Sequence, residues 1–194
     1  GIHRVSATDL FFPETAARPP RREVPVPKLS RGAFQQLLKH ERARFQRGLL
    51  SWLRSPQDKS GISEMLGAVK RIEATQDASS ARSFWWATTG MLSALAEGSL
   101  PVDASVKQLC ARVDLQIRRL FEGSKNVAER MMRDVLYFVA QTDSEDEVVK
   151  RVKDTYQLHS VIPTTETSPP APEEAVRRKL RDVLAATEEA WNKY

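Results

Sequence analysis

Apolar residues recur at helical spacing along most of this chain, and this pattern restricts its fold more than any other feature. One such stripe lies in residues 31–54 and consists of Phe34, Leu38, Phe45, Leu49 and Trp52. These residues share one side of an α-helix, because the helix repeats every ~3.6 residues. The two-residue alternation typical of a β-strand appears nowhere in the chain. The sequence therefore predicts an all-α protein.

Seven stretches show the helical pattern and are predicted as helices: residues 31–54, 59–77, 79–97, 103–122, 127–142, 144–157 and 173–193. Ser30, Asn126 and Ser144 are predicted N-caps, and Gly98 is expected to end the third helix. The short connections favour antiparallel neighbours, so we expect a helical bundle. Residues 127–142 have the widest apolar face and are expected to be the most central helix.

Prolines divide the chain into parts. Residues 1–29 and 164–172 are proline-rich and predicted to be linkers, because proline lacks a backbone donor and favours extended neighbours. They bracket a predicted bundle at 30–163 and leave 173–194 as a separate helix, a candidate start of a next module. Within the first linker, residues 9–13 (Asp-Leu-Phe-Phe-Pro) are apolar enough to pack on a helix surface, either of this bundle or of a preceding domain. The linker-like beginning suggests a segment of a longer polypeptide.

The composition limits which kinds of partner the chain could bind and which cellular compartment it fits. The net charge of +5 raises the question of nucleic acid, but the basic residues are interleaved with Asp and Glu, and no nucleic-acid-binding motif accompanies them. We expect solvated helix faces and no nucleic-acid partner. No apolar run approaches the ~20 residues that span a bilayer, so no membrane insertion is expected. The single cysteine, Cys110, favours a reducing, cytoplasmic setting.

The sequence carries no recognisable catalytic or metal-binding pattern. The histidines at positions 3, 40 and 159 lie in separate segments, and no glycine-rich phosphate loop or nucleophile elbow is present. Cys110 lies on an apolar stripe and is interpreted as core rather than as a nucleophile, as are Met131 and Met132. We therefore expect no metal, no cofactor and no enzymatic activity in this segment.

His40 is the one alternative to this view. It points away from the apolar stripe of its helix, so it could accept a phosphoryl group on a ring nitrogen, with Arg44 and Arg47 near enough to hold the phosphate. A phosphoacceptor usually has a small neighbour one turn away that opens a path for the donor, and Ala43 and Phe45 provide no special opening. A solvated surface histidine is the favoured interpretation.

Two adjacent tryptophans mark the third predicted helix, within Ser83–Leu92. Trp85 falls in the apolar stripe with Phe84, as expected of core. Trp86 falls nearly opposite, beside Gly90, because neighbouring residues on a helix point about 100° apart. A large aromatic side chain on the polar side of a helix is expected either to contact a partner protein or to be covered by another segment of the chain.

Four stretches carry a family resemblance: ERARFQRGLLSWLR (41–54), SFWW (83–86), VDLQIRRL (113–120) and LYFVA (136–140). Together they resemble the N-terminal region of the very large CheA-like hybrid histidine kinases of the twitching-motility Chp system, the ChpA/PilL type of proteobacteria. Those proteins carry tandem histidine-phosphotransfer (HPt) and HPt-like modules before the kinase core, and the related pilus regulator FimL resembles the same region. The resemblance covers about residues 30–163.

The resemblance implies an HPt-like four-helix core with additional helices. An HPt domain exposes its phosphoacceptor in the pattern His-x-x-Lys-Gly, and residues 86–90 have that spacing. Here Trp86 replaces the histidine, Thr89 replaces the lysine, and Gly90 is retained. Since indole cannot replace imidazole as the nucleophile, phosphotransfer would be lost at this position. The face would then be a docking surface, or be covered by residues 10–12 or another helix.

The implied function is a non-catalytic HPt-like scaffold or docking module of a chemotaxis-type two-component histidine kinase that controls type IV pili and twitching motility. The implied parent chain is a hybrid sensor histidine kinase, and this segment is not itself an enzyme. The implied partners are proteins: response regulators, neighbouring HPt-like modules or pilus regulators. The alternative is an active phosphotransfer domain that uses His40.

Overall fold

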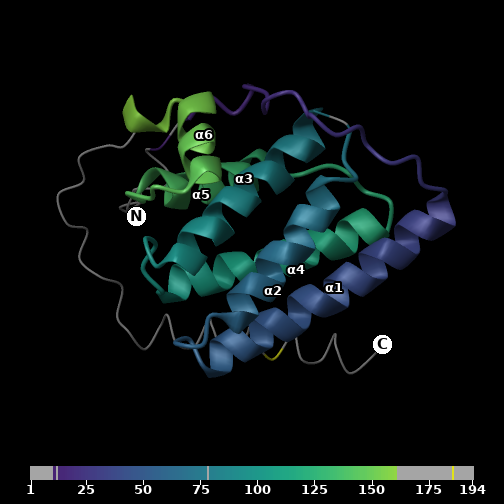
Figure 1. Cartoon of the computed structure of the whole chain (residues 1–194), viewed down its shortest axis with the longest axis horizontal. Helices are drawn as coiled ribbons and strands as arrows, with labels where there is room; N and C mark the ends of the chain where they lie inside the picture. The colour runs from purple at the N-terminus through teal and green to yellow at the C-terminus, as the bar shows by residue number, and fades with distance from the viewer. Residues whose placement is uncertain (1–10, 12, 78, 161–184, 186–194) are drawn as a thin grey trace, which may run out of the picture.

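The computed structural model describes residues 11, 13–77, 79–160 and 185, and these form a bundle of α-helices (Figure 1). The elements are α1 (Arg31–Arg54), α2 (Ser60–Glu73), α3 (Ser79–Glu97), α4 (Ala104–Phe121), α5 (Glu129–Ala140), α6 (Glu147–Thr155) and the short 3₁₀ turn η1 (Leu158–Ser160). No strand occurs among these residues, so the prediction of an all-α helical bundle is confirmed. The helix predicted at 173–193 lies outside the described residues, except that Ala185 is helical.

The helix ends follow local hydrogen bonding. The Ser30 hydroxyl accepts from the Ala33 amide at 3.1 Å, as predicted for an N-cap. Gly98 ends α3 with a φ of 88°, a conformation that glycine adopts without strain. Asp103 caps α4 by accepting from the Val106 amide at 2.9 Å.

Two predicted caps are wrong. The helix after Asn126 begins only at Glu129, its N-cap is Ala128, and the Asn126 carbonyl accepts from the Gln116 side chain instead. The last described helix is capped by Asp146 rather than Ser144. The Asp146 carboxylate accepts from two amides of the first turn, where negative charge is favourable.

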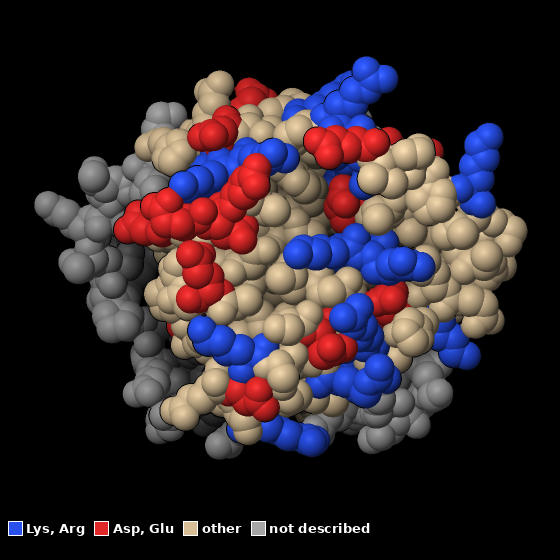
Figure 2. All heavy atoms as spheres, viewed as in Figure 1, with Lys and Arg blue, Asp and Glu red and all other residues tan. Residues whose placement is uncertain are grey.

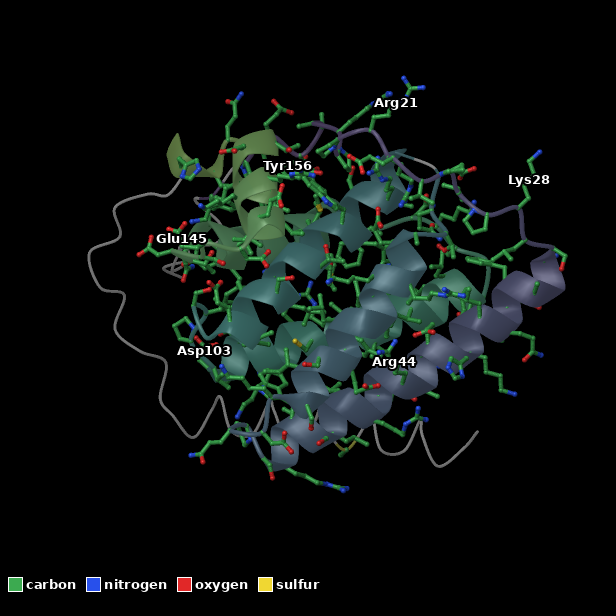
Figure 3. All side chains as sticks on the ribbon, viewed as in Figure 1. Arg21, Lys28, Arg44, Asp103, Glu145 and Tyr156 are labelled. Atoms are coloured by element: carbon green, nitrogen blue, oxygen red, sulfur yellow. The ribbon has the colours of Figure 1, made fainter. Side chains whose placement is uncertain are left out.

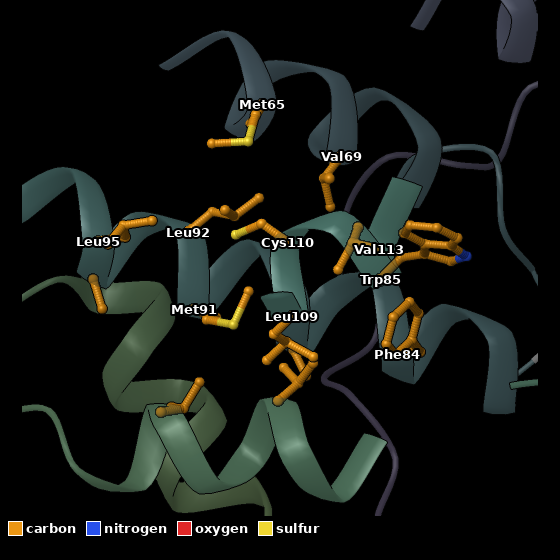
Figure 4. Close-up of a cluster of buried hydrophobic side chains, with 14 of the residues drawn as sticks. Met65, Val69, Phe84, Trp85, Met91, Leu92, Leu95, Leu109, Cys110 and Val113 are labelled. Carbon is orange, nitrogen blue, oxygen red and sulfur yellow. The ribbon is translucent and has the colours of Figure 1, made fainter. Parts of the chain in front are cut away.

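The core lies among α2, α3 and α4. Figure 4 shows apolar side chains from all three helices meeting there, among them Met65, Leu92 and Cys110, which are buried. α3 contacts α2, α5 and α6, and from Ala81 to Leu95 only Arg82 and Trp86 are not fully buried. On α5, residues Arg133, Asp134, Tyr137 and Phe138 remain half-buried. The most central helix is therefore α3, and the prediction that residues 127–142 occupy this place is wrong.

Two glycines set the contact between α1 and α2. A Cβ added at Gly48 would lie 2.5 Å from the Gly61 carbonyl oxygen, and one added at Gly61 would lie 2.5 Å from the Gly48 carbonyl oxygen. Any side chain at either position would overlap the backbone of the other helix. The absence of side chains at this pair therefore allows the two helix backbones to approach closely.

The segment before α1 is held against the bundle. The Phe11 ring is buried, and its centroid lies 5.6 Å from that of Tyr137 on α5 in an edge-on arrangement. Arg22 donates to the Glu73 carboxylate and to the carbonyls of Glu73 and Gln76, while Arg82 donates to the Pro20 carbonyl. The expectation that this apolar stretch packs on a helix is confirmed for Phe11. Leu10 and Phe12 lie outside the described residues.

Candidate functional site

The face of α3 that carries Trp86 is covered by α6. Trp86 is half-buried, and its ring centroid lies 6.3 Å from that of Tyr156, which follows α6 (Figure 3). Gly90 is buried, and a Cβ at this position would lie 3.0 Å from Cγ2 of Val152 on α6. The Thr89 hydroxyl donates to the Trp86 carbonyl at 2.6 Å. This face was expected to be either a docking surface or covered by another segment. In the structure, α6 and the residue after it cover part of it.

The chemistry of this contact is apolar. Burial raises the pKa of the Tyr156 phenol, and nearby Ser83 and Arg82 only partly oppose that rise. Tyr156 therefore stays uncharged at neutral pH. Val152 covers Gly90, so α6 would have to move before a partner could reach Gly90, whereas Trp86 is still half-exposed.

His40 is exposed on α1. Arg44, which was expected to hold a phosphate on His40, forms ion pairs with two carboxylates. Nε of Arg44 lies 2.8 Å from a carboxylate oxygen of Glu64 on α2, and Nη1 lies 3.6 Å from Glu41 (Figure 3). The hydrogen bond with Glu64 raises the pKa of the Arg44 guanidinium. Arg47 is exposed. A phosphate on His40 would therefore compete with two carboxylates for Arg44, while Arg47 could approach it freely.

The remaining chemical candidates are packed in the core. Cys110 is fully buried, and burial raises the pKa of its thiol to about 12, so it is protonated and unreactive at neutral pH. Met131 and Met132 are also buried in the apolar core, as predicted. Across the described residues, no cluster of His, Cys, Asp and Glu has an arrangement that could hold a metal ion. None of the described helices is long and apolar enough to cross a membrane.

The charged side chains are mixed rather than segregated. Figure 2 shows Lys and Arg interspersed with Asp and Glu over the face toward the viewer. Many of them form pairs between neighbouring helices, such as Arg112 with Asp134 at 2.8 Å. The positive net charge is therefore distributed over ion-paired helix surfaces, at least on this face.

A groove lies between α4 and α5. It consists of two adjoining hollows of about 380 and 460 Å³ that share Arg112. The first is lined by Asp103, Ser105, Gln108, Leu109, Arg112, Arg130, Asp134, Tyr137, Phe138 and Gln141. The second is lined by Arg112, Leu115, Gln116, Arg118, Arg119, Glu122, Ala128 and Met131. We call these residues together the α4–α5 groove.

The groove combines apolar surface with cationic side chains. Leu115 is 51% exposed in the middle of α4, and the half-buried rings of Tyr137 and Phe138 line the first hollow. Arg112 and Arg119 flank Leu115 on the same side of α4, three residues before it and four residues after it. Exposed apolar side chains beside charged ones occur at many protein-binding surfaces.

The sequence contains one signal for this groove that the helical pattern alone does not reveal. Leu115 lies among the arginines of α4, outside the apolar stripe of that helix. A single exposed leucine is common in proteins and carries little information by itself. The groove becomes visible only when α5 is placed beside α4, which depends on the tertiary structure.

A family model and a curated relative, both described below, point to the same protein family. A family model described as the second domain of the FimL scaffold protein matches residues 30–169. Scaffold protein FimL from Pseudomonas aeruginosa is 25% identical to this chain over 134 residues, which cover 69% of this chain and 23% of that protein. The chain thus spans about a quarter of the length of that relative. No solved structure matches the chain at a significant level. Because the family model spans most of its length, the chain belongs to the family of FimL scaffold protein second domains.

Proposed function

We propose that this chain is a non-catalytic protein-docking module of a scaffold that regulates type IV pili and twitching motility. The observation that carries the proposal is its membership of the FimL second-domain family, whose P. aeruginosa relative is named a scaffold protein. The burial of Cys110 and the apolar cover over Trp86 and Gly90 agree with a binding role rather than a catalytic one. A scaffold acts by holding other proteins together, so its function requires at least one docking surface.

The α4–α5 groove is the surface we assign to this role. It is formed by two helices, which is the geometry that accommodates an additional amphipathic helix of a partner. Leu115 is exposed and lines its second hollow, where a partner side chain could cover it. The proposed partners are cytoplasmic proteins: response regulators, neighbouring HPt-like modules or pilus regulators.

The relation to phosphorelay proteins is a finer part of the proposal. The spacing of Trp86, Thr89 and Gly90 supports descent from an HPt module that lost its phosphoacceptor, within a chemotaxis-type two-component system. In this view the parent chain is a scaffold or a hybrid histidine kinase of that system. The covered position of Gly90 agrees with a site that no longer needs access for a phosphoryl donor.

Replacing Leu115 with glutamate is expected to abolish docking and leave the fold intact. The introduced carboxylate stands four residues before Arg119, a spacing that supports a helix, while it removes the exposed apolar side chain of the second hollow. We expect the twitching zone of the source organism to shrink to that of a strain lacking the whole protein. The matched control is Val24→Glu, also an exposed apolar residue but outside the groove, which should twitch normally. Normal twitching of the Leu115→Glu strain would remove the groove from the proposal.

The alternative function, phosphotransfer through His40, is favoured by the exposure of that side chain on α1. Incubation of the chain with a phosphorylated kinase or receiver tests it directly. We expect no acid-labile phosphohistidine, because Arg44, which would have to hold the phosphate, is paired with Glu64. Label that appears and is then lost in His40→Gln would replace the docking proposal with a catalytic one.

A further inference from the structure

The carboxylates that line the α4–α5 groove already have partners within the chain. Asp103 is the N-cap of α4 and accepts a hydrogen bond from an amide of its first turn. Asp134 is bonded to Arg112 at 2.8 Å, and Glu122 is bonded to Arg118 at 2.9 Å. The negative charge along the groove is therefore mostly compensated by groups of the chain itself.

Two of the four arginines that line the groove have no such partner. Arg119 on α4 and Arg130 on α5 are exposed, and no described residue forms a hydrogen bond or an ion pair with either guanidinium group. Arg119 lines the second hollow, where Leu115 is exposed. Arg130 lines the first hollow, as do the half-buried rings of Tyr137 and Phe138. The uncompensated charge of the groove is therefore positive, and each hollow combines it with some apolar surface.

The stability of the helices does not account for both arginines. Arg119 lies in the last turn of α4, where the helix dipole favours a cation. Arg130 is the second residue of α5, where the dipole disfavours a cation. A negatively charged ligand in the groove would interact favourably with both arginines, although the two helix ends affect them in opposite ways.

A protein segment fits this distribution of charge better than a nucleic acid does. A nucleic-acid strand carries a phosphate on every nucleotide, so it would also place negative charge opposite Asp103 and Glu122. A helix of a partner protein can carry carboxylates at single positions, with apolar side chains between them. Arginine pairs with a carboxylate through two parallel N–H donors, which makes such a contact specific in geometry.

We propose that the α4–α5 groove binds an acidic amphipathic helix of a partner protein. Its carboxylates pair with Arg119 and Arg130, and one of its apolar side chains covers Leu115. This inference rests on the proposed function, because it names the chemistry of the partner that the docking module binds. Binding should weaken as the salt concentration rises, since salt screens charges that remain accessible to water.

Peptides from the proteome of the source organism, displayed on phage and selected against the full chain, test the proposal. We expect the enriched peptides to carry net negative charge, and their affinity to fall about tenfold in Arg119→Glu and in Arg130→Glu. Loss of the fold would not explain both results, because the new carboxylate is unfavourable at the end of α4 but favourable at the start of α5. Replacing one peptide carboxylate with arginine should restore binding to the Arg119→Glu variant.

Arg47→Glu is the matched control. Arg47 is an exposed arginine on α1 that lines neither hollow of the groove and has no partner among the described residues. Its reversal changes the net charge of the chain by the same amount, so the affinity for the enriched peptides should stay unchanged. An equal loss in Arg47→Glu would mean that the peptides respond to the net charge alone and would overturn the proposal.

Three further outcomes overturn the proposal. Enriched peptides that need Leu115 but carry no net negative charge would refute the acidic partner and leave the docking role of the groove in place. If no enriched peptide loses binding in Leu115→Glu, the docking role of the groove fails together with this inference. Binding of a fluorescein-labelled DNA duplex that is lost in Arg119→Glu and Arg130→Glu would assign these arginines to phosphate groups instead.

Discussion

Replacing Gly48 with alanine is expected to lower the free energy of unfolding by about 2–3 kcal/mol. The new Cβ would lie 2.5 Å from the Gly61 carbonyl oxygen, 3.0 Å from the Glu64 Cβ and 3.1 Å from the Met65 amide nitrogen. Two of these three atoms belong to the backbone of α2, so no side-chain rotation can relieve the overlap. The two helices must separate, and the buried core behind them, including Trp52, then loses its close contacts.

Gly32 provides the matched control for this substitution. It lies in the first turn of α1, is exposed, and has no atom within 4 Å of an added Cβ. Gly32→Ala should therefore raise stability by about 0.5 kcal/mol, through the lower conformational entropy of the unfolded chain. Urea denaturation followed by circular dichroism at both positions measures the difference. If Gly48→Ala and Gly32→Ala unfold at the same urea concentration, the close approach of α1 and α2 is not tight in solution.

The helices themselves could be predicted because their signals are local. The apolar stripe, the Ser30 cap and the left-handed Gly98 are each read within a few residues, and α1 and α3 have the predicted bounds. The prediction of an N-cap fails where two candidate residues lie close together in the sequence. Ser144 and Asp146 are both good caps, and the sequence alone does not show which backbone turn the chain selects.

The candidate site could not be predicted in the same way, because it depends on how helices meet. A helical wheel correctly places Trp86 opposite the stripe of α3, but it cannot show that Val152 and Tyr156 cover that side. It likewise cannot show that Gly48 faces Gly61, or that Leu115 borders a hollow beside α5. Each of these contacts joins residues that are distant in sequence.

Replacing Arg42 with alanine is expected to destabilise the protein by about 3 kcal/mol. Arg42 on α1 donates to both oxygens of Asp114 on α4, at 3.2 and 3.4 Å, and Gln46 donates to one of them at 3.2 Å. The Asp114 side chain is only 3% exposed, whereas water still reaches part of Arg42. Removing the arginine leaves a carboxylate inside the α1–α4 contact with one neutral donor, and the cost of that uncompensated charge exceeds the value of the lost pair itself.

A surface pair and a double substitution distinguish this mechanism from simple loss of an ion pair. Arg151 bonds Glu147 at 2.7 Å, but both side chains are mostly exposed, so Arg151→Ala should change stability by less than about 0.5 kcal/mol. Combining Arg42→Ala with Asp114→Ala removes the stranded charge, so the double variant should be more stable than the sum of the two single effects predicts. Urea denaturation of the four proteins of this cycle measures the coupling. Strict additivity would mean that Asp114 is hydrated in solution and that the contact between α1 and α4 rests on apolar packing alone.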